Sequence, residues 1–401
     1  MFNLLGRLIQ RVEPDWRPTY ESASSPSGDL TRQLDLTEVP PNGDVRVKVV
    51  GIGGAGGNAV SRMASAGLRG VEFLAVNTDV QALRRIKGVP TLAIGPTTTS
   101  GMGSGGNPDL GRKATRESHD QVGKLLEGSE MVFVTAGMGG GTGTGAAPLI
   151  ADIARRQGAL TVGVVTRPFS FEGDNRAAVA DRGLRQLQQK VDTLITVEND
   201  RLLSSLDGEM SLERGFRVAD EVLRQGVQGI SEIITVPGTI NVDFADVKSI
   251  MTNGGPSFMA LGEGKGRTAA TDAVEAALAN PLFDAPIEGA AGILFNIKGG
   301  GDLSIGQVHE VAGIIKDASK TQAQVIFGVV QDPRWQKRVQ ITLVATGITT
   351  PLTSEEREEH FSATDRIVPI HTIGSREPVP VGSPQTNGHQ ALAFPNMRKL
   401  V

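Results

Sequence analysis

The chain carries Gly137-Met138-Gly139-Gly140-Gly141-Thr142-Gly143-Thr144-Gly145, a stretch that indicates its fold more directly than any other. Residues 131–135 before it are apolar, as in a buried strand, and residues 146–154 after it have apolar side chains at helical spacing. Because glycine has no Cβ, such a turn lets a phosphate approach the N–H groups of the helix N-terminus, where the helix dipole favours its charge. A flexible linker would lack the flanking strand and helix. We therefore interpret the stretch as a phosphate-binding loop.

A second glycine-rich turn follows the apolar run 45–50 and opens another helix: Gly51-Ile52-Gly53-Gly54-Ala55-Gly56-Gly57-Asn58. It matches the dinucleotide pattern G-x-G-x-x-G, which by itself suggests a nicotinamide-dependent dehydrogenase with Asp79 as the acid beyond the next strand. A dinucleotide fold, however, usually presents one phosphate loop, and this chain has a third glycine-rich stretch at 101–106. Several loops around one polyphosphate favour a nucleoside triphosphate.

A P-loop enzyme is not indicated, because the chain lacks the pattern G-x-x-x-x-G-K-[ST]. The superficially similar stretch Gly262-Glu263-Gly264-Lys265-Gly266-Arg267-Thr268 has glycine after its lysine, and no apolar strand is expected to lead directly into it. We expect a plain turn there.

Composition restricts the class of protein. The chain has 401 residues, enough for two domains with cores of their own, and its 51 glycines cluster in motifs rather than in a low-complexity tract. A formal net charge of −4 gives no basis for nucleic-acid binding. The chain has no cysteine, no apolar run of membrane-spanning length and no signal-peptide pattern, so we expect a cytoplasmic protein without disulfides.

The order of the expected elements predicts an α/β fold. Strands and helices alternate from residue 45 to about residue 196, which predicts a Rossmann-like domain with a parallel sheet and helices on both of its faces. A long central helix is expected over 212–234. A second, smaller α/β domain follows, with strands at 292–297, 324–329 and 339–344.

Glu172 and Arg176 follow the expected strand 160–166 and are four residues apart. They fit an acid at a helix start with an ion pair one turn later. They also fit contacts of Glu172 with ribose hydroxyls and of Arg176 with a sugar or phosphate. The residues alone do not choose between these two interpretations.

Phe216 and Asp220 are also four residues apart, on one face of the long helix. A carboxylate accepts hydrogen bonds from both N1–H and the 2-amino group of guanine, a pair of donors that adenine does not offer. Phe216 would then stack on the base. The alternative is an ordinary helix with a core phenylalanine and a solvated aspartate.

The acidic loop Asn241-Val242-Asp243-Phe244-Ala245-Asp246 follows the long helix after a Pro-Gly turn. One interpretation is that Asp243 or Asp246 caps the next helix. The other is that the carboxylates orient a water molecule. If the nucleotide lies at the strand ends of the first domain, this loop lies at the opposite end of the long helix and would act on another subunit's nucleotide. Repetition of that head-to-tail contact would make a filament.

Together these motifs closely resemble those of the tubulin/FtsZ family, specifically its bacterial cell-division proteins. The resemblance covers about residues 45–348 and rests on the order of Gly53–Asn58, Asn77-Thr78-Asp79, Gly139–Gly145, Pro168–Gly173, Asn199-Asp200-Arg201-Leu202 and Asn241–Asp246. It implies a GTPase that polymerises head to tail and forms the division ring, with GTP hydrolysed at the subunit interface. The alternative within the family is a paralogue that binds nucleotide as a structural filament protein and hydrolyses little.

The resemblance also assigns roles to residues. Phosphate contacts fall on the two glycine loops, at Gly53, Gly54, Ala55, Gly56, Gly57, Asn58, Gly139, Gly140, Gly141, Thr142 and Gly143. Sugar and phosphate contacts fall on Glu172 and Arg176, base contacts on Asn199, Phe216 and Asp220, and the catalytic loop on Asn241, Asp243 and Asp246. The ligands are GTP and GDP, with Mg²⁺ held mainly by phosphates and no protein ligand assigned to it.

We divide the chain into five segments on this basis. They are an N-terminal extension (1–44), a GTP-binding domain (45–210), a central helix (211–235), a C-terminal activation domain (236–348) and a disordered tail with a terminal peptide (349–401). The implied location is the cytoplasm, at the mid-cell division site near the inner membrane.

The sequence departs from the family pattern in three places. The third loop has Thr99-Ser100 where relatives usually carry a basic residue, so a phosphate or filament contact is expected to differ. The terminal peptide 393–399, the expected site for division-machinery proteins, keeps Phe394, Pro395 and a basic end but lacks an acidic start. The N-terminal extension is longer than the resemblance leads us to expect.

That extension starts with apolar residues at helical spacing and arginines on the other side: Phe2, Leu4, Leu5, Leu8, Ile9 and Val12, with Arg7 and Arg11. A short amphipathic helix of this kind would contact the membrane weakly by itself, and many copies in a filament would strengthen the attachment. A disordered tail and a helix docked on a partner protein are the alternatives.

Overall fold

The structure is a computed structural model that describes residues 45–348, apart from 69, 204–210, 237, 281–286 and 321–322. The predictions for the N-terminal extension and for the C-terminal tail and its terminal peptide lie outside the described residues. Within the described residues, no helix combines the length and the apolarity needed to cross a membrane.

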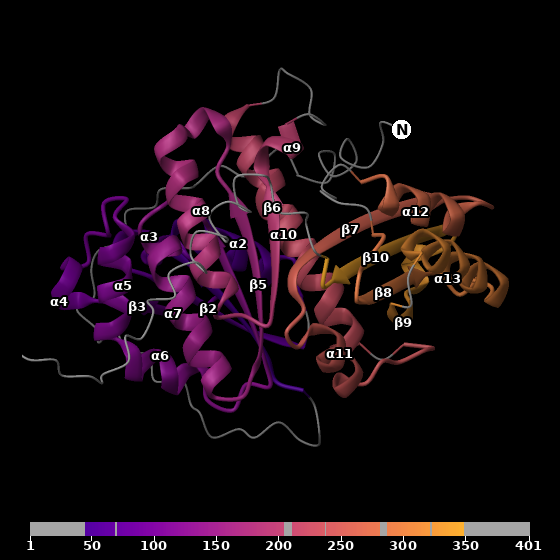
Figure 1. The fold of residues 1–401 in the computed structure, drawn as a ribbon, viewed down its shortest axis with the longest axis horizontal. Helices are drawn as coiled ribbons and strands as arrows, with labels where there is room; N and C mark the ends of the chain where they lie inside the picture. The colour runs from indigo at the N-terminus through magenta and orange to yellow at the C-terminus, as the bar shows by residue number, and fades with distance from the viewer. Residues whose placement is uncertain are drawn as a thin grey trace, which may run out of the picture. The chain divides into compact units, whose positions relative to one another are not determined.

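The described strands form one sheet in the order β3-β2-β1-β4-β5-β6-β7-β10-β8-β9 (Figure 1). Their bounds are Val47–Ile52 (β1), Val71–Asn77 (β2), Thr91–Ala93 (β3), Met131–Gly137 (β4), Leu160–Arg167 (β5), Thr193–Glu198 (β6), Gly255–Lys265 (β7), Gly292–Gly299 (β8), Gln324–Gln331 (β9) and Arg338–Thr346 (β10). Strands β1 to β6 pair in parallel, whereas β10 is antiparallel to both β7 and β8. The predicted α/β fold, with a parallel sheet and a second, smaller α/β part, is confirmed.

Helices follow most of the strands. Their bounds are Gly53–Ser65 (α2), Val80–Arg85 (α3), Pro96–Thr99 (α4), Pro108–Glu117 (α5), His119–Leu126 (α6), Thr142–Arg156 (α7), Asp174–Gln188 (α8), Asn199–Leu203 (α9), Leu212–Thr235 (α10), Phe244–Met251 (α11), Ala269–Leu278 (α12) and Ile305–Ser319 (α13). Two short 3₁₀ helices are Ser170–Glu172 (η1) and Pro333–Trp335 (η2). The long helix expected over 212–234 is α10.

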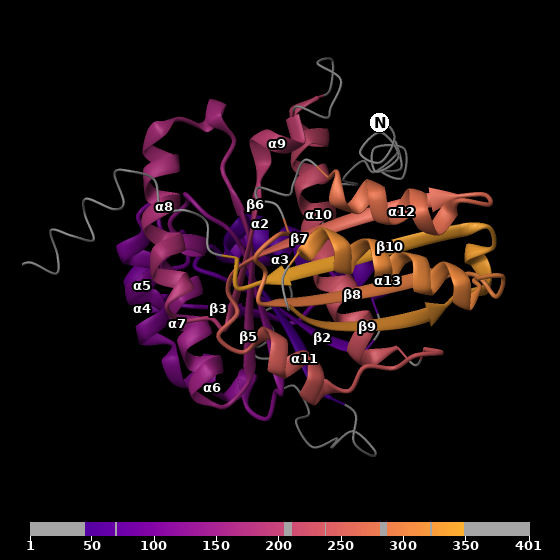
Figure 2. The same cartoon turned by 45° about the vertical axis from the view of Figure 1, so that its right-hand side comes forward.

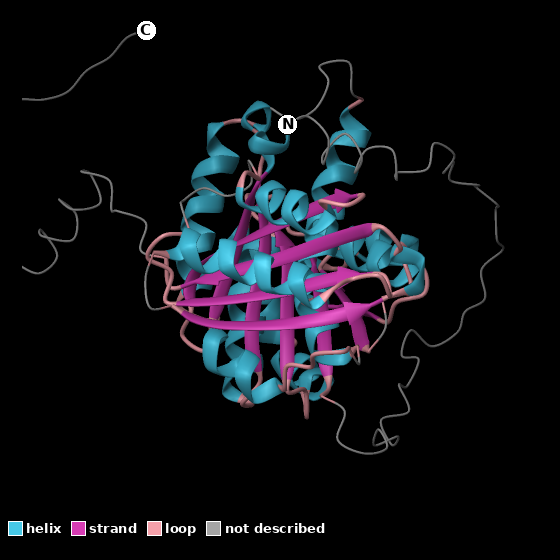
Figure 3. Cartoon of the chain, turned by 90° about the vertical axis from the view of Figure 1, so that its right-hand side faces the viewer, coloured by secondary structure: helices cyan, strands magenta, loops and turns pink. Residues whose placement is uncertain are grey.

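The parallel strands are buried on both faces, as alternation along β1 and β4 shows. Val49 and Phe133 pack in one core with α2 and α10, whereas their neighbours Val50 and Val132 pack in a second core with α5, α6 and α7. Figure 2 shows α5, α6 and α7 together on one side of the parallel strands, and Figure 3 shows helices beside the strands of the sheet. Burial on both sides explains why these strands are nearly continuous apolar runs.

Helix α10 lies close against the C-terminal strands. A Cβ on Gly226 would lie 2.9 Å from the Met259 side chain of β7, and one on Gly229 would lie 2.3 Å from the Thr342 side chain of β10. The absence of side chains at these two positions therefore allows the helix to approach the strands. On the other face of the same strands, α12 and α13 cover a third core.

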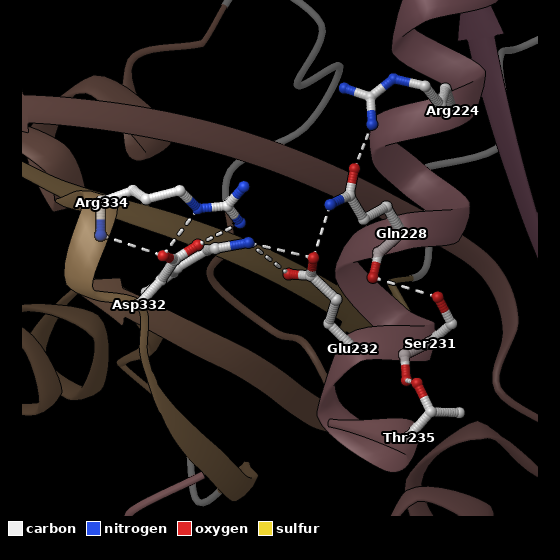
Figure 4. Close-up of polar contacts among 8 residues, drawn as sticks. Arg224, Gln228, Ser231, Glu232, Thr235, Asp332 and Arg334 are labelled. Carbon is white, nitrogen blue, oxygen red and sulfur yellow. Dashed lines mark hydrogen bonds and ion pairs between the residues drawn. The ribbon is translucent and has the colours of Figure 1, made fainter. Parts of the chain in front are cut away.

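A polar network fixes the C-terminal half of α10 to these strands (Figure 4). Glu232 of α10 accepts hydrogen bonds from the Lys298 ammonium of β8 at 3.0 and 3.2 Å. Gln228, one turn earlier, also donates to Glu232. Beyond β9, Asp332 accepts hydrogen bonds from Arg334, which lower the pKa of the Asp332 carboxyl to about 2. The ion pair of Glu232 with Lys298 therefore adds a polar connection to the apolar packing of the central helix on the C-terminal strands.

The prediction of a plain turn at Gly262–Thr268 is wrong for its first half. Residues up to Lys265 belong to β7, and only the rest turns into α12. Cβ atoms on Gly262 and Gly264 would lie 1.8 and 2.0 Å from the carbonyl oxygens of Ala273 and Ala269 in α12. These glycines therefore serve close packing of a helix on a strand, which a pattern of turn residues does not reveal.

Candidate nucleotide-binding site

The glycine loops lie at the carboxyl ends of the parallel strands. Strand order reverses between β1 and β4, because β2 lies on one side of β1 and β4 on the other. A ligand in an open α/β sheet binds at such a reversal, outside the strand ends. The loop after β1 and the loop after β4, which the sequence identified as phosphate-binding, meet at this point.

Both loops open helices whose N-termini are not capped by a side chain. Neither Ile52 before α2 nor Gly141 before α7 makes a side-chain cap bond, and neither first turn contains an acidic residue. The first N–H groups of both helices are therefore available to an anion, in the field of two helix dipoles. The two N-termini are adjacent, since a Cβ on Gly53 would lie 3.0 Å from the Gly143 nitrogen.

Some glycines of the two loops are required by close packing, whereas others have open space where a side chain would be. A Cβ on Gly143 would lie 2.7 Å from the Gly137 carbonyl oxygen, so the loop itself requires glycine there. Cβ atoms on Gly54 and Gly140 would meet no atom within 4 Å. Since packing does not explain Gly54 and Gly140, they fit a cradle in which backbone must approach a ligand.

The third glycine-rich loop is joined to the second by buried hydroxyls. Thr142, the first residue of α7, lies 2.6 Å from Thr78 and 3.0 Å from Ser104, measured between side-chain oxygens. All three residues are buried.

Asp79, the candidate ribose acid of the dehydrogenase hypothesis, caps α3 by accepting hydrogen bonds from two N–H groups of its first turn. Ser100 adopts a left-handed conformation with φ of 50°.

Glu172 and Arg176 form the ion pair that their spacing predicts. Glu172 also accepts a hydrogen bond of 3.0 Å from the Phe169 N–H, so it holds η1 in place. A Cβ on Gly139 would lie 2.8 Å from the Arg176 carbonyl oxygen, which places the start of α8 against the second loop. Both residues therefore lie beside the phosphate-binding loop, and their structural pairing leaves a ligand role open.

Three phenylalanines gather where α10 begins. Phe169 stacks on Phe171 with ring centroids 5.0 Å apart and meets Phe216 edge to face at 5.4 Å. Phe169 is buried, but Phe216 is 39% exposed and Phe171 is 57% exposed. Phe216 is thus a rigidly supported ring with a free surface, as stacking on a base requires, rather than the core residue of the alternative interpretation.

Asn199 lies just after β6 and is only 5% exposed. Its side-chain carbonyl oxygen has no hydrogen-bond partner among the described residues. A buried polar atom without a partner is costly, so this oxygen fits one that a ligand satisfies. The orphaned oxygen and the cradle at Gly54 and Gly140 are two independent signs that the residues fit a nucleotide.

Asp220 is buried rather than solvated. Its carboxylate lies 3.3 Å from the Arg62 guanidinium of α2, and its side chain is 11% exposed. Burial raises the pKa of Asp220 to about 6, and the positive charge of Arg62 opposes this increase. A desolvated carboxylate near an exposed aromatic ring is the arrangement that the guanine hypothesis requires.

The acidic loop lies at the other end of α10. Asp243 caps α11, since its carboxylate accepts a hydrogen bond of 3.1 Å from the Asp246 N–H, and Asn241 accepts one of 2.6 Å from the Gly238 N–H. Helix α10 has 24 residues, which corresponds to a length of about 36 Å. Asp243 and Asp246 are exposed, and they follow the C-terminal end of α10, whereas Asp220 lies in its N-terminal half.

Comparisons with known proteins match both halves of this architecture. The model of the "Tubulin/FtsZ family, GTPase domain" matches residues 46–207, and that of the "FtsZ family, C-terminal domain" matches residues 255–349. An FtsZ dimer structure from M. jannaschii is 42% identical and has a TM-score of 0.74, over 77% of this chain and 90% of that one. The chain belongs to the tubulin/FtsZ family.

Further solved structures show the same fold. The structure of a mutant FtsZ from M. jannaschii is also 42% identical, with a TM-score of 0.73, over 76% of this chain and 92% of that one. CetZ1 from Haloferax volcanii, described as a GDP-bound monomer, is 23% identical with a TM-score of 0.68, over 80% of this chain and 100% of that one. At that identity the likeness shows the fold alone. The predicted family is confirmed, and the bacterial origin stays a prediction.

Sequence reasoning missed Arg62 and the hydroxyls of Thr78 and Ser104. Arg62 is the one charged residue of α2 and lies one turn after Asn58, but nothing in the local pattern indicates that it meets a residue of α10. Thr78 was part of a quoted motif, and Ser104 stood in the third loop. Their bonds to Thr142 join segments that are distant in sequence, so only the tertiary structure reveals them.

Proposed function

We propose that this chain is an assembly-dependent GTPase that polymerises head to tail. The single observation that carries the proposal is the placement of its two half-sites at opposite ends of α10. Asp220 lies in the N-terminal half of α10 and pairs with Arg62 of α2, the helix that the first glycine loop opens. Exposed Asp243 and Asp246 follow the C-terminal end of α10, which lies about 22 Å along the helix axis from Asp220. Stacking one subunit on the next would bring the two half-sites together.

The phosphate half-site would act mainly through backbone. The uncapped N-termini of α2 and α7 would bind the phosphates and offset the charge that develops during in-line attack by water. The hydroxyls of Thr78, Ser104 and Thr142 would offer oxygen atoms at this edge, of the kind that Mg²⁺ prefers. Mg²⁺, held mainly by phosphate oxygens and water, would supply further neutralisation of charge.

The base half-site would select guanine. The Asp220 carboxylate would accept hydrogen bonds from N1–H and the 2-amino group, and Phe216 would stack on the ring. The unpartnered oxygen of Asn199 would accept a further hydrogen bond from the base. Glu172 and Arg176 would contact the sugar and a phosphate.

The acidic loop would complete the site of the neighbouring subunit. We propose that Asp243 and Asp246 orient the attacking water there and that Asn241 holds the loop in shape through Gly238. The comparison structures include a protein described as an FtsZ dimer and one described as a GTPγS-bound CetZ2 protofilament, which supports self-association. In the cell we propose a cytoplasmic filament at the division site, with no role in nucleic-acid binding.

Phosphate release from GTP, measured against protein concentration, tests this proposal. Assembly-dependent hydrolysis gives a threshold concentration, below which specific activity is negligible. Asp246→Ala should bind GTP with unchanged affinity and hydrolyse almost none. Asp317→Ala, at an exposed position on α13, is the matched control and should behave as the original chain does.

Three results would contradict the proposal. Constant specific activity at all concentrations would show that one subunit contains the whole site. Normal hydrolysis by Asp246→Ala would remove the acidic loop from the chemistry. If filaments form with GTP but neither the original chain nor Asp246→Ala hydrolyses it, the alternative is favoured, in which a paralogue binds nucleotide as a structural filament protein.

A further inference from the structure

Asp220 has one polar partner at the base end of the site. The ion pair with Arg62 is the only hydrogen bond or ion pair of the Asp220 side chain within the part of the chain that the structure describes. Its distance of 3.3 Å joins Oδ2 to the guanidinium Nε. The other oxygen, Oδ1, is left for a base, one helical turn from the exposed ring of Phe216.

Arg62 occupies a fixed position relative to both ends of the ligand site. It lies on α2, nine residues after Gly53, which corresponds to about 14 Å along the helix axis from the phosphate-binding N-terminus. Helix α2 packs against α10. The same rigid helix therefore offers N–H groups to the phosphates and a guanidinium to the acid that reads the base.

The remaining charged groups nearby are occupied with one another or lie on adjoining elements. Within α10, Arg217 pairs with Glu213, and Glu221 pairs with Arg224. Strands β5 and β6 and helix α9 also pack against α10. On the two strands, Arg167 pairs with Glu198. On α9, Asp200 accepts a hydrogen bond from the Ser170 N–H, and Arg201 has interactions of its own. Arg62 is the charge that acts on the Asp220 carboxyl.

We infer that Arg62, through its ion pair with Asp220, determines the selection of guanine over adenine. This rests on the proposed function, in which Asp220 reads the base. An ionised carboxylate offers two acceptors, which match the two donors of guanine. A neutral carboxyl offers one donor and one acceptor, which match the 6-amino donor and the N1 acceptor of adenine. Arg62 therefore sets specificity by holding Asp220 in the ionised form.

Affinities of GTP and ATP for the nucleotide-free full chain, measured between pH 5.5 and pH 8 at constant ionic strength, test the inference. The original chain should prefer GTP strongly at pH 8 and lose this preference toward acid pH. In Arg62→Gln the midpoint of the loss should move to higher pH by about one unit, and the preference at pH 7 should accordingly fall by up to about ten-fold. Arg62→Lys, which keeps the charge, should return the midpoint toward its original value.

Asp220→Asn provides the matched reference. Its amide always offers one donor and one acceptor, so this variant should discriminate poorly at every pH. If Arg62→Gln keeps the original GTP preference and the original midpoint, the role of Arg62 is overturned while the proposed base site stands. If the original chain shows no preference for GTP at any pH, both the base assignment and the role of Arg62 are overturned.

Discussion

At the scale of single residues, the burial of Asp220 sets stability against the proposed recognition of the base. Its pKa is raised from 3.8 to about 6, so between these pH values the folded chain holds a proton that the unfolded chain has released. The free energy of unfolding therefore decreases as pH rises through this window, by about 3 kcal/mol in all. Above about pH 6, burial of the ionised carboxylate is a constant penalty.

Asp220→Asn should consequently stabilise the nucleotide-free chain at pH 7.5, by up to about 3 kcal/mol, while weakening GTP binding. Urea unfolding at pH 7.5 and at pH 4.5, without nucleotide, measures the change. The gain should shrink at the lower pH, where Asp220 in the folded chain is already neutral. A variant less stable than the original chain at pH 7.5 would show that the ion pair with Arg62 outweighs the cost of burial.

Asp243 combines a structural and a proposed catalytic role, and the two are separable. Asparagine caps helices as well as aspartate does, so Asp243→Asn should keep the bond to the Asp246 N–H and the stability of the chain. Asp243→Ala should lose about 1 kcal/mol of stability. Both variants should lose GTP hydrolysis in steady-state assays. Hydrolysis at the original rate by Asp243→Asn would show that the Asp243 carboxylate serves only as a helix cap.

At the scale of elements, the glycines at the start of α2 and α7 have different functions. Gly54→Ala places a methyl group in open space, so thermal unfolding should occur near the original temperature while GTP affinity falls. Gly145→Ala places a Cβ 2.0 Å from the Pro108 carbonyl oxygen and should destabilise the packing of α7 on α5 by about 2 kcal/mol or more. Unchanged GTP affinity in Gly54→Ala would show that this part of the loop does not approach the phosphates.

At the scale of the whole molecule, the ion pair between Glu232 and Lys298 joins the central helix to the C-terminal strands. Both side chains are largely buried, so a double-mutant cycle with Glu232→Gln and Lys298→Met should give a coupling energy of about 1–3 kcal/mol in urea unfolding. The exposed pair Glu288–Lys320 is the control and should give less than about 1 kcal/mol. Equal coupling in the two pairs would show that burial adds nothing to the connection.

The local sequence pattern was sufficient to predict many of the helices, strands and turns of this protein. The alternation of apolar runs and helical spacing predicted the parallel strands, and the Leu212–Thr235 helix differs by one residue from its expected range. The positions of the two glycine turns between a strand and a helix were predicted as the structure has them, and their binding of phosphate stays a prediction. The Glu172–Arg176 ion pair was predicted from a spacing of four residues, although Glu172 ends η1 and Arg176 lies in the first turn of α8.

Tertiary structure decided what depends on contacts between distant segments. The sequence left Asp220 as a solvated or a base-reading acid, and only its burial beside Arg62, 158 positions earlier, makes it the latter candidate. The hydroxyls of Thr78, Ser104 and Thr142 meet because the segments after β2, α4 and β4 converge. The glycines of β7 were mistaken for a turn because the sequence pattern does not show that α12 packs closely against them. The periodicity of apolar residues indicates which face of a helix or strand is buried, but it does not indicate which residue of another element lies against that face.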